Sequence, residues 1–203
     1  ESDEKASSIN GTWFSPRTSF FGFLGSARSW PVTDAGTEAM ANSNPLETTQ
    51  KDCIPIGAPG LMFYPVASTV DIQDDRVILT IDWLDSVRTV YLDGRAHPPA
   101  SETSLHGHST GRWEGDTLII DTTNFSAHLM GLSTSLPSSS QKHLIERLAV
   151  SEDGTQMNYS GVMEDPIYLT EAVEWSGNWQ YRPNMSHSNQ ACDIEIARRF
   201  LED

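Results

Sequence analysis

The chain has 203 residues, which is enough to bury one substantial core, and its hydrophobic content of 37% is typical of a folded protein. Its formal net charge of -15 repels phosphate backbones and anionic lipid headgroups, so we expect neither nucleic acid nor a membrane surface as a partner. No apolar run approaches the roughly 18 residues of a membrane span, so no membrane insertion is expected.

The N-terminal part of the chain predicts little regular structure. Residues 1–9 are polar and predict a flexible N-terminus, followed by a single β-rich domain over residues 10–203. Ile9 to Phe14 predicts a first short strand. Asp34 is placed to cap a short helix that runs to Asn42. Prolines and glycines between residues 52 and 67 predict irregular structure that crosses one face of the domain.

The middle of the chain alternates apolar and polar residues with a period of two, which predicts strands. The segment 76–83 is expected to pair with 87–93 as a hairpin, and Glu114-Gly115-Asp116 is expected to turn a second one. The remaining expected strands are 117–122, 143–151, 156–163 and 172–181. The segment 193–201 has helical spacing. We therefore predict a mainly β fold, an antiparallel β-barrel (lipocalin-like) or a sandwich, with a short C-terminal helix.

Gly107-His108-Ser109-Thr110-Gly111 spells the G-x-S-x-G of a serine-hydrolase nucleophile elbow. Such an elbow needs a buried strand before the serine and a helix after it. The polar segment 100–104 precedes the motif and a turn follows it, so we expect Ser109 to lie in a hairpin and not to act as a nucleophile.

Ionisable residues are dense just before that turn, and the segment is either a solvated loop or the wall of a site. The cluster comprises Asp93, Arg95, His97, His106, His108, Arg112, Glu114 and Asp116. His106 and His108 have the i, i+2 spacing that on a strand puts both rings on one face, where Asp93 or His97 could complete a metal site. No Walker loop, Rossmann glycine pattern or C-x-x-C is present, so no organic cofactor is expected.

Glu146 alternates with Leu144 and Leu148 and is expected to point into apolar surroundings. It either forms a buried structural ion pair with Arg88 or Arg147, or it is an interior acid whose raised pKa lets it exchange protons with a ligand.

A small barrel has room for one small ligand, which aromatic residues would surround. The expected lining, besides Arg88, is Trp83, Tyr91, Trp113, Phe125, Tyr159 and Trp175. Ordinary core packing explains these aromatic residues equally well. If they line a cavity, a small apolar or aromatic molecule is the expected partner.

The only two cysteines, Cys53 and Cys192, are far apart in the sequence. We expect them to form one disulfide, the alternative being two buried free thiols. Closing so long a loop would contribute roughly 4 to 5 kcal/mol to stability in the chain-entropy model.

Residues 87–98 and 107–122 carry a DGRxHP … GHSxGRWEGDTL pattern that resembles the signature of a widespread, uncharacterised family of exported bacterial proteins. Similar elements extend the resemblance over roughly residues 50–200. The resemblance implies a secreted or periplasmic, β-rich protein and supplies no activity. The segment after Cys192 departs from the His- and Glu-bearing continuation that is usual in the family.

Two hypotheses follow from these residues. The first is an exported, cofactor-independent enzyme that uses His97 or His108 with Asp93 or Glu146 for acid–base chemistry on a small, largely apolar substrate. Hydrolysis, elimination, isomerisation and cyclisation all fit it. The second is a non-catalytic envelope module that binds a ligand or has a structural role, with or without a metal at His106 and His108. The sequence does not indicate an oligomeric state.

Overall fold

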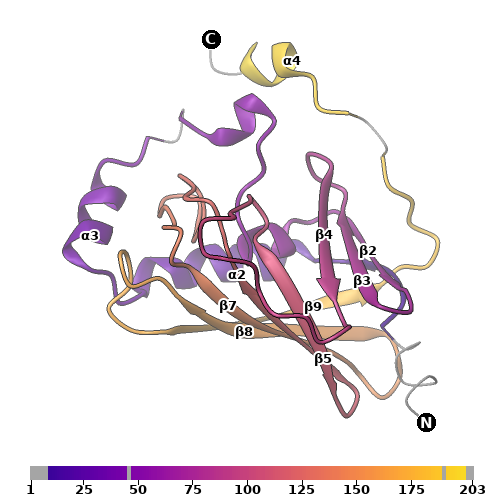
Figure 1. Cartoon of the computed structure of the whole chain (residues 1–203). Helices are drawn as coiled ribbons and strands as arrows, with labels where there is room; N and C mark the ends of the chain where they lie inside the picture. Colours follow the sequence, from indigo (N-terminus) through magenta and orange to yellow (C-terminus); the bar gives the residue numbers. More distant parts are fainter. Residues whose placement is uncertain (1–8, 45–46, 189–190, 200–203) are drawn as a thin grey trace.

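The structure, a computed structural model, describes residues 9–44, 47–188 and 191–199. Its strands follow one another in chain order around a closed barrel, which is the first of the two β architectures expected (Figure 1). The strands are β1 (Gly11–Phe14), β2 (Ala67–Ile72), β3 (Arg76–Ile81), β4 (Ser86–Tyr91), β5 (His108–Glu114), β6 (Thr117–Thr123), β7 (His143–Val150), β8 (Gln156–Glu164) and β9 (Val173–Tyr181). The helices are α2 (Arg17–Ser26), α3 (Asp34–Ala41) and α4 (Ile194–Arg199), with short 3₁₀ turns η1 (Ala27–Ser29), η2 (Thr49–Asp52) and η3 (Gly60–Phe63).

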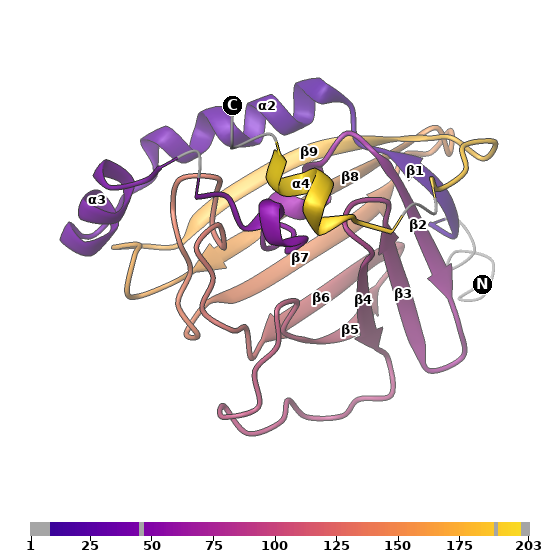
Figure 2. The ribbon, with the colours of Figure 1, turned by 90° about the horizontal axis from the view of Figure 1, so that it is seen from above.

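Neighbouring strands pair antiparallel, with one exception that shapes the candidate site. β4 and β5 run parallel and share two residue pairs in register, Val90 with Ser109 and Tyr91 with Thr110. The hairpin of β5 and β6 shares seven. Parallel neighbours cannot be joined by a tight turn, so the long connection 92–107 returns the chain before β5 begins (Figure 2). We call this weakly paired junction the β4–β5 seam.

Both predicted hairpins are present. β3 pairs with β4 from Arg76 opposite Tyr91 to Ile81 opposite Ser86. Trp83, expected as the last inward residue of that strand, lies in the turn, because β3 ends at Ile81.

Two elements were not predicted. α2 lies beside β9 (Figure 2), and its Phe23 stacks on Phe63 of η3 with ring centroids 4.8 Å apart. Its sequence gives a weak signal because Phe23 is its one buried residue and two glycines interrupt it. The second is β2, which residues 67–72 form between β1 and β3. Of these residues, only residue 67 belonged to the segment that was expected to be irregular.

The helix expected after Asp34 is present, with a different cap. Thr33 is the N-cap: its side-chain oxygen accepts a hydrogen bond from the Gly36 backbone N–H at 3.1 Å. Asp34 lies in the first turn, and the helix ends at Ala41 with Asn42 as its C-cap.

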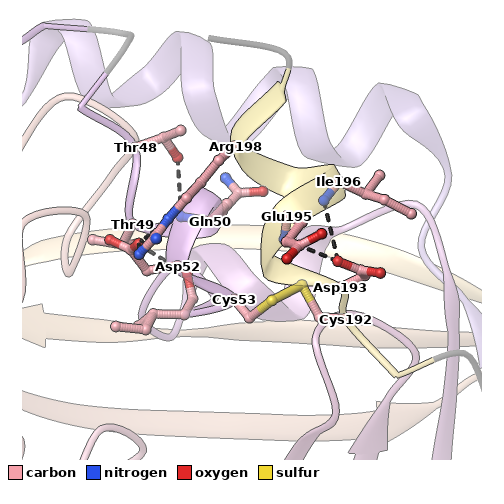
Figure 3. The surroundings of a disulfide bond; sticks show 11 residues. Thr48, Thr49, Gln50, Asp52, Cys53, Cys192, Asp193, Glu195, Ile196 and Arg198 are labelled. Atoms are coloured by element: carbon pink, nitrogen blue, oxygen red, sulfur yellow. Dashed lines mark hydrogen bonds and ion pairs between the residues drawn. A yellow bond between two sulfur atoms is a disulfide. The ribbon is translucent and has the colours of Figure 1, made fainter. Parts of the chain in front are cut away.

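Cys53 and Cys192 form the expected disulfide, which joins η2 to the segment that enters α4 (Figure 3). Arg198 of α4 reaches across to Asp52 at 2.6 Å, beside the disulfide. α4 confirms the short C-terminal helix, and residues 200 and 201, which were expected to continue it, lie outside the described residues. Most of the expected flexible N-terminus, residues 1–8, is outside them as well.

Aromatic side chains fill the barrel. Trp13, Tyr159 and Trp179 are fully buried, and the rings of Tyr159 and Trp179 lie 5.6 Å apart. Zero exposure leaves no water-sized space beside these rings, so this part of the interior is a packed core. Space for a ligand therefore lies at the wall or at the ends of the barrel and not among these rings.

Candidate functional site

The centre of the barrel holds a buried ion pair between Arg88 of β4 and Glu146 of β7. Their side chains are 1% and 0% exposed, and Arg88 Nη1 donates to Glu146 Oε1 at 2.8 Å. Tyr159 Oη donates to the same oxygen at 2.6 Å, and Thr122 Oγ1 donates to Oε2 at 3.2 Å. Of the two expected partners, Arg88 is therefore the one that pairs with Glu146. Arg147 lies 3.5 Å from Glu114 and is half exposed.

Glu146 does not behave as the interior acid considered from the sequence. Burial alone would raise the pKa of its carboxyl group, but the charge and hydrogen bonds of Arg88, with those of Tyr159 and Thr122, hold the pKa below its usual value. Glu146 therefore stays ionised near neutral pH and does not exchange protons there.

A series of polar side-chain contacts, the Asp121 chain, lies on the outer wall of the barrel and centres on Asp121 of β6. His108 Nδ1 lies 3.0 Å from His97 Nδ1, and His97 Nε2 lies 3.3 Å from Asp121 Oδ1. His143 Nε2 also lies 2.9 Å from Asp121 Oδ1. The partly exposed Asp121 alternates along β6 with the buried Ile120 and Thr122, so it faces outward. His97 and His108 thus lie on the outer face of the barrel and do not share a site with Glu146.

A pocket of about 240 Å³ opens at the β4–β5 seam, between β4 and the start of β5. It combines residues of the outer face, such as Tyr91 and His108, with the interior Arg88 and Ser109. The full lining is Val87, Arg88, Thr89, Tyr91, Ser104, His106, Gly107, His108 and Ser109. The lining of the seam pocket therefore includes both His108 of the Asp121 chain and Arg88 of the inner ion pair.

The turn 104–107 shapes one side of this pocket. Ser104 N donates to Asn124 O at 3.0 Å, and Ser104 Oγ donates to Gly107 O at 3.0 Å. Gly107 has φ +69°, and a Cβ there would lie 2.4 Å from the Thr123 carbonyl oxygen. Because glycine has no side chain, the backbone of the turn packs directly against β6. The space next to β4 is therefore left open.

His106 lines the pocket and was not among the predicted catalytic residues. Its Nδ1 is buried and has no hydrogen-bond partner among the described residues. Burial, followed by the positive charges of Arg88 and Lys142, lowers the pKa of His106 to about 4. The imidazole is therefore neutral at pH 7.

His106 and His108 do not form the metal pair that was considered as an alternative from the sequence. The left-handed Gly107 separates the turn from β5, so the i, i+2 spacing does not fall on one strand. His108 stacks on Tyr91 with ring centroids 5.3 Å apart, whereas the cations that act on His106 are the interior Arg88 and Lys142. Across the described ranges, no three His, Cys, Asp or Glu side chains form a group that could hold a metal ion.

The other predicted site residues are dispersed. Asp93 is paired with Arg95 on the surface, and hydrogen bonds from Arg95 lower the pKa of its carboxyl group to about 2. Tyr91 also faces outward, with the Arg95 guanidinium 3.7 Å from its ring centroid. Of the remaining aromatic residues, Phe125 and Tyr159 are fully buried and Trp175 is 7% exposed, while Trp83 and Trp113 are partly buried against the core.

Ser109 is a strand residue, as expected, and not a nucleophile on an elbow. It lies in β5, opposite Thr122, and its hydroxyl is 2.9 Å from Thr122 Oγ1. The segment that follows is a hairpin into β6, with Gly115 at φ +61°.

Lys142 is a buried cation that the sequence did not indicate. It is 2% exposed, and its Nζ donates to the carbonyl oxygens of Ala58 and Gly131 at 3.0 Å each. Burial, with the charge of Arg88, lowers its pKa to about 7. Its ammonium lies 4.0 Å from the ring centroid of Phe125.

Comparisons with models of known protein families, with curated proteins and with solved structures found no significant match. Within the described ranges, none of the helices combines the length and the apolar character needed to cross a membrane.

The lowered pKa of His106 predicts a pH dependence of stability. The His106 imidazole takes up a proton near pH 4 in the folded state and near pH 6.5 in the unfolded state. The neutral imidazole therefore contributes fully to the free energy of unfolding above pH 6.5, and this contribution is lost as the pH falls to 4. We expect a loss on the order of 3 kcal/mol over this range. Urea unfolding of the wild type and of His106→Gln at pH 7 and pH 4 measures it, because the variant lacks this proton. An equal loss in both proteins would contradict the assignment.

Proposed function

We propose that this chain is an exported enzyme, without an organic cofactor, in which His108 acts as a general base on a small substrate held in the seam pocket. The observation that carries the proposal is the ordered chain from Asp121 through His97 to His108, which ends at a pocket. Proton transfer next to a carbonyl group, as in isomerisation or elimination, is the reaction class that fits best.

The contacts along this chain indicate which nitrogen of His108 is basic. His97 Nε2 lies 3.3 Å from Asp121 Oδ1, a polar contact without hydrogen-bond geometry, and because a carboxylate favours an N–H beside it we assign the proton of His97 to Nε2. A neutral His97 then accepts at Nδ1, and His108 donates to it through its own Nδ1–H at 3.0 Å. Nε2 of His108 is left with a free lone pair, and it makes no hydrogen bond with any described residue.

The electrostatics favour a neutral base. Burial, followed by the charges of His97 and Arg95, lowers the pKa of His108. When Nε2 removes a proton from the substrate, the positive charge on the imidazole is stabilised through His97 by the Asp121 carboxylate. The electron pair of the broken C–H bond moves onto the carbonyl oxygen of the substrate, and return of the proton to another atom completes an isomerisation.

Two features support the exported location. A disulfide that joins distant segments is typical of oxidising compartments. The resemblance to exported bacterial proteins points the same way and stays a prediction.

Exchange of α-protons for deuterium tests the catalytic proposal directly. Acetone, butanone, pyruvate and 2-oxobutyrate are incubated in D₂O with the protein and followed by proton NMR. We expect catalysed exchange with at least one compound, a loss of about 100-fold or more in His108→Gln, and a smaller loss in Asp121→Asn. Because the pKa of His108 is lowered from its ordinary 6.5, the fall of the wild-type rate with decreasing pH should have its midpoint below pH 6.5.

His187→Gln is the matched control, since His187 bonds Thr69 of β2 at 2.7 Å and lies outside the Asp121 chain. Full exchange activity in His108→Gln would exclude His108 as the base. Tight binding without any exchange would favour the second hypothesis, a ligand-binding module.

A further inference from the structure

We propose that a second pocket, between the β3–β4 hairpin and the C-terminal segment, binds a small primary amine that carries an apolar body beside its ammonium group. This C-terminal pocket has a volume of about 660 Å³, which is within the range typical of small-molecule sites. Val87 is common to its lining and that of the seam pocket, and the other lining residues of the two pockets differ. The inference therefore goes beyond the proposed function and does not depend on it.

Two distant parts of the chain form the walls of the C-terminal pocket. One wall is the end of the β3–β4 hairpin, where Leu84 and Asp85 both have φ +52° and turn the chain tightly. The other wall is the segment that enters α4. The backbone N–H and the hydroxyl of Ser188 hold this segment, because they donate to the two oxygens of Asp82 at 2.7 and 2.9 Å. The disulfide of Cys192 anchors it a second time (Figure 3), so the pocket is built into the fold.

Much of the lining is apolar and within reach of a ligand. Val87 is 48% exposed and Ile196 is 54% exposed, although both are large hydrophobic side chains. Val66 and Trp83 are partly buried beside them in the same lining. A ligand in the pocket can cover this accessible surface directly, and removing apolar surface from water is favourable. The lining therefore favours a ligand with an apolar body.

The charged groups of the lining are acidic. Asp82, Asp85 and Asp193 carry carboxylates, and the described lining includes no Lys or Arg. Asp85 and Asp193 are exposed, and no ion pair links either of them to a described residue. His187, which carries a charge only when protonated, lies 3.9 Å from Asp82 Oδ1. Both walls therefore attract a cation and repel an anion, and the formal net charge of -15 acts in the same direction.

The carboxylates keep acceptor capacity for a ligand. Asp193 Oδ1 accepts the backbone N–H groups of Glu195 and Ile196 at 2.9 and 3.2 Å, while Oδ2 makes no hydrogen bond with a described residue. An ammonium group offers three N–H donors and a positive charge to such oxygens, whereas a hydroxyl group offers one donor and no charge. Combined with the apolar lining, this chemistry favours an amine over an alcohol of the same length.

NMR titration with phenylbutylamine, and with phenylbutanol and phenylbutyrate as its neutral and anionic counterparts, tests the inference. We expect the amine to bind about tenfold more tightly than the alcohol, and the carboxylate to bind most weakly. Added salt should weaken the amine more than the alcohol, because it screens the attraction of the exposed carboxylates. The signals of Val87 and Ile196 should shift when the amine binds.

Two variants remove charge and keep the local structure. Asp85→Asn suits the left-handed position, which asparagine tolerates, and Asp193→Asn keeps the side-chain oxygen that accepts from the first turn of α4. Each should weaken the amine about threefold and leave the alcohol unchanged. Asp74→Asn, in the exposed turn at the other end of β3, is the matched control and should change neither affinity. Ile196→Ser should weaken the amine and the alcohol alike.

The outcomes separate this inference from the proposed function. Amine binding that persists in His108→Gln, while exchange of α-protons is lost, would support both proposals. Loss of amine binding in His108→Gln would place the amine in the seam pocket and overturn the inference. Equal affinity for the amine and the alcohol would also overturn it, as would wild-type amine affinity in the double variant of Asp85→Asn with Asp193→Asn. Self-association that Ile196→Ser abolishes, measured by light scattering, would instead assign the pocket to a second copy of the chain.

Discussion

Replacing Glu146 with Leu is expected to lower the free energy of unfolding by about 3 to 5 kcal/mol. The substitution leaves Arg88 charged and 1% exposed without a counterion, and it removes the acceptor used by Tyr159 and Thr122. Without Glu146, the Arg88 guanidinium loses the attraction that offset the cost of removing its charge from water, and that cost remains. Urea unfolding at pH 7 measures the change.

Two further variants show whether the charge is responsible. Glu146→Gln keeps the volume and one acceptor, so it should cost less than Glu146→Leu. The double variant Arg88→Met with Glu146→Leu removes both charges and should recover most of the loss, since apolar replacements of buried pairs are often neutral. Arg147→Ala, on the outer face of the same strand, should change stability by about 0.5 kcal/mol or less. A double variant as unstable as Glu146→Leu would argue against an electrostatic cause.

Removing the disulfide by the double substitution Cys53→Ala and Cys192→Ala is expected to lower the free energy of unfolding by about 5 kcal/mol. The two cysteines are 139 residues apart, so the cross-link restricts a very large loop of the unfolded chain. The loss should appear as a lower urea midpoint and a lower melting temperature at fixed protein concentration.

The neighbouring contacts provide the control for that measurement. Arg198 and Asp52 form an ion pair beside the disulfide, but their side chains are 57% and 38% exposed, so Arg198→Ala should cost less than about 1 kcal/mol. If the cysteine double variant were no less stable than Arg198→Ala, the covalent bond would add nothing beyond the contacts around it.

Strand parity was the most informative signal in the sequence. Alternation within β7 was enough to predict that Glu146 points inward, and alternation within β4 did the same for Arg88. Parity is local, because successive side chains of a strand point to opposite faces whatever the fold. It could not show that these two strands face one another across a barrel, which depends on how the sheet closes.

The parts of the site that sequence reasoning missed depend on non-local geometry. Asp121 was predicted only as a strand residue, and its proposed role arises because His97 and His143 reach it from two other segments, with His108 contacting His97 in turn. His106 was considered for metal binding only. The signal that could have distinguished it is Gly107, which interrupts the strand pattern between His106 and His108 and indicates a turn.

The existence of a parallel pair such as the seam follows from the strand count of the barrel. Each antiparallel neighbour reverses direction, and a closed ring must return to its starting direction after one circuit, so the number of reversals has to be even. The described barrel has nine strands, which allows at most eight reversals and obliges at least one pair of neighbours to run the same way. β4 and β5 are that pair, and no point substitution can turn them into a hairpin. Only the gain or loss of a whole strand would allow every pair of neighbours in the ring to run antiparallel.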